Sequence, residues 1–112
     1  MKFDVTRVKI RVTVPTKDTD KVRDAICNAG AGTIGEYTYC SSIYRSLGTF
    51  IPSDKAHPHI GIRNKLSRVK EDMLEVVCDV DNVKRVLDAL RKAHPYEEPA
   101  IDVVPLIDER DL

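Results

Sequence analysis

The last two elements expected of this chain, a helix and a strand, meet in the stretch His94-Pro95-Tyr96-Glu97-Glu98-Pro99-Ala100-Ile101-Asp102-Val103-Val104-Pro105-Leu106. Its first two prolines are four residues apart and cannot lie inside one helix, so a helix must end at His94 and an extended run must begin at Ala100. The turn between them presents an imidazole, a phenol and two adjacent carboxylates. The stretch is therefore either a rigid corner that aims the last strand or a functional site.

The first part of the chain reads as a strand followed by a helix. Apolar and polar residues alternate over positions 8–14, which predicts a strand from about Val5 to Pro15. Thr16 is a suitable N-cap, and apolar residues then recur at helical spacing as far as Ala29.

The rest of the chain repeats this order after one extra strand and a loop. β-Branched and aromatic residues predict a second strand over Thr33–Tyr44, followed by an irregular loop over Gly48–Ser67. Alternation predicts a third strand over Met73–Val80, and Asp81 is expected to cap the second helix. The last strand is expected over Ile101–Leu106.

This order predicts an α+β protein with the ferredoxin-like split βαβ (βαββαβ) sandwich, in which both helices cover one face of a four-stranded antiparallel sheet. A single domain is expected over residues 1–107, and the acidic tail 108–112 is expected to fray. The other face of the sheet would carry Lys9, Arg11, Glu75 and Val77. That mixture is suited to contact another subunit or the long loop.

Composition narrows the function classes. Of the 112 residues 42% are hydrophobic, and 18 Lys and Arg balance 18 Asp and Glu, so no net field attracts nucleic acid or anionic lipid. The basic run Arg63–Lys70 is interpreted as a solvated loop, and the predicted third strand lacks the aromatic residues with which such folds bind RNA. No apolar run is long enough to span a membrane, and three widely spaced cysteines fit no disulfide framework. We expect a cytoplasmic protein with neither a nucleic-acid nor a membrane partner.

Several motifs together resemble a known family. They are Gly30-Ala31-Gly32-Thr33-Ile34-Gly35 with Tyr37 and Cys40, Gly48-Thr49-Phe50-Ile51-Pro52, Pro58-His59-Ile60-Gly61, and HPYEEPAIDVVPL from His94. This combination is similar to the YqfO-type domain, which is inserted into the metal-binding chain of longer bacterial Nif-three-like dinuclear metal proteins. The resemblance implies the PII/CutA-like version of the fold and an oligomeric module, commonly a trimer. Because the metal-binding body is absent from this sequence, we expect the domain to act as a chain of its own.

The leading functional interpretation is a non-catalytic, self-associating PII/CutA-like module with a regulatory role. It would bind a small ligand, an ion or a protein partner between the Gly48–Gly61 loop and the proline corner. The candidate ligand-binding residues are Tyr37, His59, His94, Tyr96, Glu97 and Glu98. Catalysis is disfavoured because Cys40 has no neighbouring histidine in the sequence and adjacent glutamates seldom converge on one substrate atom.

The alternative interpretation is a divalent-metal site, for example for zinc, with His94, Glu97 and Glu98 as ligands and His57 or His59 completing the shell. In a purely structural interpretation, these residues have no ligand: His94 caps the second helix, Tyr96 packs as an anchor and the glutamates are solvated.

Overall fold

A computed structural model describes residues 2–112. Its strands and helices are β1 (Arg7–Pro15), α1 (Thr19–Asn28), β2 (Ser42–Phe50), β3 (Ser67–Asp79), α2 (Val83–Ala93) and β4 (Ile101–Pro105). Single turns of 3-10 helix, η1 (Thr16–Asp18), η2 (Val80–Asn82) and η3 (Glu109–Asp111), precede the two helices and end the chain. No helix within residues 2–112 is long and apolar enough to cross a membrane.

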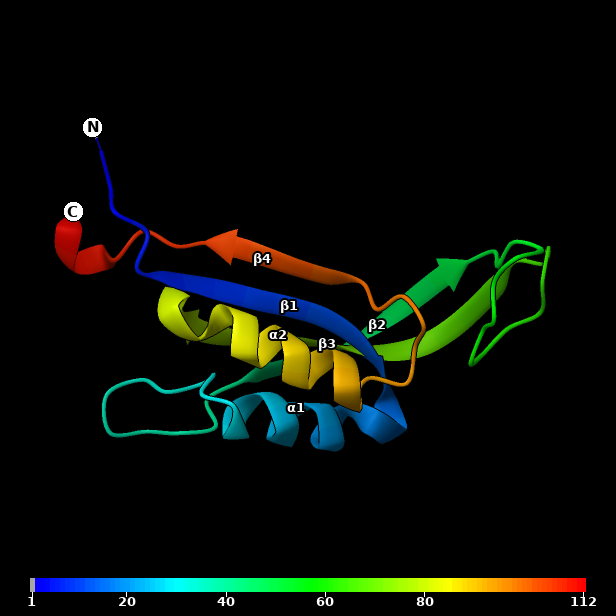
Figure 1. The fold of residues 1–112 in the computed structure, drawn as a ribbon, viewed down its shortest axis with the longest axis horizontal. Helices are drawn as coiled ribbons and strands as arrows, with labels where there is room; N and C mark the ends of the chain where they lie inside the picture. Colours follow the sequence, from blue (N-terminus) through cyan, green and yellow to red (C-terminus); the bar gives the residue numbers. More distant parts are fainter. Residues whose placement is uncertain (1) are drawn as a thin grey trace.

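The four strands form one antiparallel sheet in the order β2-β3-β1-β4. The central strand β1 is paired on both sides, so that Val12 lies opposite Leu74 of β3 and Ile101 of β4. Figure 1 shows both helices on the same face of this sheet. The predicted split βαβ fold is therefore confirmed.

The core lies between the sheet and the two helices, as the alternation in the sequence predicts. Every second side chain of β1 is buried, and each helix buries residues four positions apart, such as Val22 with Ile26 and Val86 with Leu90. The buried apolar residues are Val8, Ile10, Val12, Val14, Val22, Ile26, Cys27, Ala31, Leu74, Val76, Cys78, Val86 and Leu90. Within residues 2–112, no helix covers the other face of the sheet.

Two strands extend beyond the rest of the sheet as a ribbon. β1 ends where Pro15 pairs with Glu71, but β2 and β3 continue to pair as far as Phe50 and Ser67. Figure 1 shows this ribbon projecting past the helices, with the irregular loop 51–66 at its tip. We call β2 together with residues 67–71 of β3 the β2–β3 ribbon.

The second strand was predicted in the wrong place. Most of Thr33–Tyr44 is a loop, with only an isolated bridge between Ile34 and Tyr37. Positive φ angles at Gly35 (55°) and Tyr39 (57°) bend the backbone there and prevent an extended strand. The true strand, β2, begins at Ser42.

Other boundaries also differ from the expectations. Ser67–Lys70, assigned to a solvated loop, forms the start of β3, which shortens the long loop to residues 51–66. Thr16 and Asp81 lie within 3-10 turns and are not N-caps; Asp18 and Asn82 hold those positions without a side-chain capping bond.

The segment that leads into β1 and the segment that follows β4 lie at the same end of the sheet (Figure 1). In the acidic tail, the backbone N–H and the guanidinium of Arg110 both donate to the Asp108 carboxylate, which organises η3. That this tail frays in solution stays a prediction.

Candidate functional site

His94 lies at the C-terminal end of α2 and is only 6% exposed. Its backbone N–H donates to the Leu90 carbonyl, and its backbone then turns to an extended conformation. The ring Nδ1 accepts the Tyr96 backbone N–H at 3.0 Å, so Nε2 carries the proton and donates to the Thr13 carbonyl at 2.7 Å. His94 thus ends α2 and joins it to β1 and to the corner.

Burial determines the charge state of this imidazole. Desolvation lowers the pKa of His94 below its usual value, and this effect outweighs the opposing hydrogen bond to the Thr13 carbonyl. His94 is therefore a neutral structural group at pH 7.

Tyr96 is the centre of an aromatic cluster that joins the corner to the ribbon. Its ring lies 5.0 Å from that of His94, and 6.3 Å from those of Phe50 and His59, between ring centres. Its hydroxyl donates to Oε2 of Glu71 at 2.8 Å. Burial first, and then this bond to a carboxylate, raise the pKa of the Tyr96 phenol, which remains protonated.

Glu71 lies on β3, at the base of the ribbon, and is 4% exposed. Its side chain covers the backbone of Gly48 in β2, where an added Cβ would collide with Oε1. Gly48 therefore makes the space that lets a carboxylate lie flat against the ribbon and accept from Tyr96.

The long loop meets the corner through a second contact. The backbone N–H of His57 donates to Oε2 of Glu97 at 3.2 Å. Arg63 braces the same part of the loop, because its Nε donates to the Ala56 carbonyl at 2.7 Å. The loop and the corner are thus held together by a backbone contact and by the Tyr96 cluster.

The structure brings together four of the six candidate residues: His59, His94, Tyr96 and Glu97. Glu98 is in the same corner but is exposed to solvent. Tyr37 belongs to the loop 29–41, which Figure 1 shows at the end of the molecule away from loop 51–66, so it does not join this site. The purely structural interpretation, a capping histidine and an anchoring tyrosine, matches the geometry of His94 and Tyr96.

The residues present do not fit the metal hypothesis. Both ring nitrogens of His94 are occupied by backbone partners, so neither nitrogen is free to bind a metal ion. Within residues 2–112, no three His, Cys, Asp or Glu side chains lie close enough together to hold one. His94, Glu97 and Glu98 thus do not converge on one metal position in this geometry, and zinc binding by the corner stays a prediction.

Glu71, Phe50 and Thr13 also belong to this site, although the sequence did not predict them as site residues. Glu71 follows a basic run that looked like a loop, and Thr13 contributes only its backbone carbonyl. The one available signal was register: a strand ending at Pro15 beside a longer third strand places Glu71 at the rim of the sheet.

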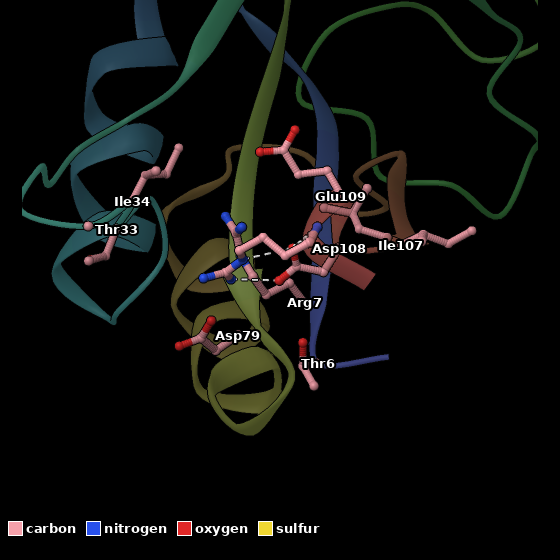
Figure 2. Close-up of a pocket in the computed structure, with 11 residues that line it drawn as sticks. Thr6, Arg7, Thr33, Ile34, Asp79, Ile107, Asp108 and Glu109 are labelled. Carbon is pink, nitrogen blue, oxygen red and sulfur yellow. Dashed lines mark hydrogen bonds and ion pairs between the residues drawn. The ribbon is translucent and has the colours of Figure 1, made fainter. Parts of the chain in front are cut away.

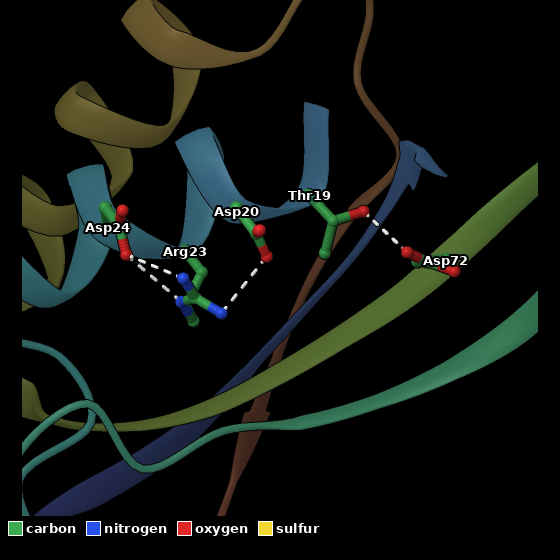
Figure 3. Close-up of polar contacts among 5 residues, drawn as sticks. All are labelled: Thr19, Asp20, Arg23, Asp24 and Asp72. Atoms are coloured by element: carbon green, nitrogen blue, oxygen red, sulfur yellow. Dashed lines mark hydrogen bonds and ion pairs between the residues drawn. The ribbon is translucent and has the colours of Figure 1, made fainter. Parts of the chain in front are cut away.

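A second buried carboxylate lies one position along β3. Thr19, at the start of α1, donates its hydroxyl to Oδ2 of Asp72 at 2.7 Å, as Figure 3 shows. Arg45 of β2 approaches the other carboxylate oxygen at 3.6 Å, although its side chain is largely exposed. This pair attaches the first helix to the base of the ribbon, on the face of the sheet opposite Glu71.

Known proteins show where this domain occurs. No protein-family model matches the sequence. Curated relatives called "GTP cyclohydrolase 1 type 2 homolog" include one from Halalkalibacterium halodurans, 43% identical over 101 residues, and one from Bacillus subtilis, 44% identical over 98. These alignments cover 90% and 88% of this chain, but the chain spans only about a quarter of the relatives, 27% and 26%.

Solved structures of other proteins also resemble this chain. A Bacillus cereus protein related to NIF3 superposes with a TM-score of 0.81 at 34% identity, over 96% of this chain and 27% of that one. The resemblance to the YqfO-type domain is confirmed. CutA from Synechococcus elongatus superposes with a TM-score of 0.69 at 18% identity, over 95% of this chain and 81% of that one, which shows the PII/CutA-like fold.

Proposed function

We propose that this chain is a non-catalytic, self-associating PII/CutA-like module with a regulatory role, and that it assembles through the β2–β3 ribbon. The observation that carries the proposal is the exposure of β2. None of its nine residues, Ser42–Phe50, is buried. A strand of this length at the edge of a sheet presents unpaired backbone groups, which proteins normally cover or protect.

The exposed apolar side chains of β2 also favour assembly through this strand. Ile43 is 42% exposed, Tyr44 48% and Leu47 54%, and Ile51 continues this apolar run into the loop. Leu47 and Ile51 lie where the ribbon projects past the end of β1, and Ile43 and Tyr44 lie along the outer edge of the sheet. In neither place does one chain supply a second layer that buries these side chains. A second copy of the chain can supply that layer, and the PII/CutA-like resemblance favours a trimer.

The proline corner is proposed to position the loop 51–66 for a small ligand or a protein partner. His57, Pro58, Gly61, Ile62 and Arg63 line a hollow of about 510 Å³ in this loop. The Tyr96 cluster and the Glu97 contact hold the base of the loop against the corner, which lowers the entropy lost on binding.

A binding role suits these residues better than a catalytic one. His94 is neutral and bonded through both nitrogens, and the Tyr96 phenol is held protonated by Glu71. Neither group is free to exchange a proton with a substrate. The three cysteines are free thiols, which suits the reducing cytoplasm as the proposed location.

Light scattering on the purified chain tests assembly. We expect an oligomer at micromolar concentration, and we expect Leu47→Glu to dissociate it because a carboxylate would enter the shared surface. Val5→Glu is the matched control, since Val5 is 47% exposed but lies before β1, away from the ribbon. A stable monomer for the unmodified chain, or equal dissociation by both variants, would contradict the proposal.

A further inference from the structure

A separate cleft lies at the end of the sheet away from the ribbon, and the function proposed above does not use it. Its volume is about 690 Å³, within the range typical of small-molecule sites. The start of β1, the end of β3, the loop after α1 and the segment after β4 all contribute walls (Figure 2).

Two opposite charges face this cleft without pairing. Arg7 and Asp79 are direct partners in the register of β1 and β3, so their side chains are on the same face of the sheet. Within the described part of the chain, neither takes part in an ion pair. A free guanidinium and a free carboxylate are therefore available side by side.

The second cation of the cleft is already neutralised. Arg110 donates to both carboxylate oxygens of Asp108, at 3.0 Å from Nε and 2.6 Å from Nη2 (Figure 2). These bonds to Arg110 lower the pKa of Asp108 to about 2, so the pair stays ionised at neutral pH. The pair closes one side of the cleft, and Arg7, whose charge also acts on Asp108, is the cation of the cleft that has no ion-pair partner within the described residues.

The balance of charge distinguishes between ligand classes. Two guanidiniums and three carboxylates line the cleft, the third carboxylate being Glu109. This leaves one negative charge in excess, which disfavours phosphates and nucleotides. A ligand with no net charge, or one positive charge, suffers no such repulsion.

The remaining surface of the cleft is apolar. Ile34 is 48% exposed and Ile107 is 55% exposed, and Figure 2 shows them on opposite sides of the charged residues. Leu106 adds a third aliphatic side chain to the lining. A ligand that fills the cleft would therefore also carry an apolar group.

We propose that this cleft binds a small zwitterion with an apolar side chain, the class to which free aliphatic and aromatic α-amino acids belong. The ligand carboxylate meets Arg7, its ammonium meets Asp79, and its side chain lies against Ile34, one of the two isoleucines that flank the charged residues. A simple amine would leave Arg7 unpaired, and a simple carboxylate would leave Asp79 unpaired. The zwitterion satisfies both charges.

Calorimetry with L-leucine, L-methionine and L-phenylalanine as probes tests this site, with each probe at up to about 1 mM, a range that detects weak specific binding. We expect at least one probe to bind. Its acetylated, amidated form should not, because it lacks both charges. The amine alone, isopentylamine for leucine, should bind at least about tenfold more weakly, because the charge-assisted bond to Arg7 is lost.

Arg7→Gln and Asp79→Asn should each weaken the zwitterion by about tenfold or more. Lys9→Gln is the matched control, since Lys9 is on the same face of β1 but outside the cleft. Circular dichroism and melting of each free variant should match the unmodified chain. Ligand-induced NMR shifts should fall on the amides of Thr33 and Gly35, and not on those of the corner.

Several results would overturn the proposal. These are the absence of binding by all three probes, equal binding of the capped form or of the amine, or affinity that survives both Arg7→Gln and Asp79→Asn. Shifts confined to the proline corner would likewise place any ligand at the other site.

Discussion

The phenol of Tyr96 and the carboxylate of Glu71 meet at 2.8 Å, in a place where Glu71 is 4% exposed. These residues belong to the corner after α2 and to the base of the ribbon, so their bond ties the helical layer to the proposed assembly surface. His94 adds the bond to β1 through the Thr13 carbonyl. The corner therefore connects α2, β1 and β3. The contribution of each contact to stability can be measured by single substitutions.

Tyr96→Phe should destabilise the fold, because it keeps the aromatic ring but leaves the buried Glu71 carboxylate without its donor. The expected loss is about 1.5–3 kcal/mol of unfolding free energy, the range for a hydrogen bond to a charged group. Urea denaturation would measure it. Tyr39→Phe is the control, because the Tyr39 hydroxyl donates to Oδ1 of Asn28 in an exposed loop away from the ribbon, where the loss should stay below about 1 kcal/mol. Equal losses would show that burial of Glu71 does not strengthen its bond.

Gly48→Ala tests the space over which Glu71 lies. The new methyl group would collide with Oε1 of Glu71, and the side chain could relieve this only by moving away from Tyr96. We expect destabilisation of about 1–3 kcal/mol, and a smaller effect of the same change in a Tyr96→Phe background, because that bond is already lost. A double-mutant cycle by chemical denaturation gives the coupling. Strictly additive losses would mean that Gly48 serves backbone geometry alone.

The buried parts of the fold could be predicted from the sequence, because burial on one face leaves a period in it. Residues 8–14 alternate and became β1, and the apolar spacing around Val86 and Leu90 became α2. Pro95 and Pro99 correctly predicted the end of α2 and the start of β4, since proline restricts the backbone regardless of its neighbours.

The ribbon left no such period. None of the residues of β2 and none of Ser67–Lys70 in β3 is buried, and their apolar side chains occur in no regular order. The aromatic run around Tyr37 and Tyr39 looked more strand-like than Ser42–Phe50, but strand propensity without burial is a weak guide. The Tyr96–Glu71 bond could not be predicted either, because it depends on contact between segments that are distant in the sequence.

His94 should make stability depend on pH. Burial holds its folded pKa below the ordinary value of about 6.5, so between those two values the unfolded chain binds more protons than the folded one. Stability should therefore fall as the pH is lowered from about 7 through the ordinary value of about 6.5, by at most about 1.4 kcal/mol per pH unit from this group.

The measurement is urea denaturation across this pH range for the unmodified chain and for His94→Gln. The variant should be less stable at neutral pH, because its side chain cannot reproduce both backbone bonds. Its stability should also decline less steeply on acidification, because no imidazole remains at this position to be protonated. Carboxylates common to both proteins cancel in the comparison. Identical slopes would assign the pH dependence to other groups.

Pro95→Ala addresses the corner as an orienting device. Proline limits the conformations of the unfolded chain and holds His94 in the extended backbone that ends α2, with ψ at 134°. Alanine should reduce stability by about 1 kcal/mol through the unfolded-state entropy alone. Light scattering should also show weaker assembly, because a looser corner holds Tyr96 less firmly against the ribbon. A variant that melts and assembles like the unmodified chain would show that the His94 and Tyr96 bonds fix the corner without help from the proline ring.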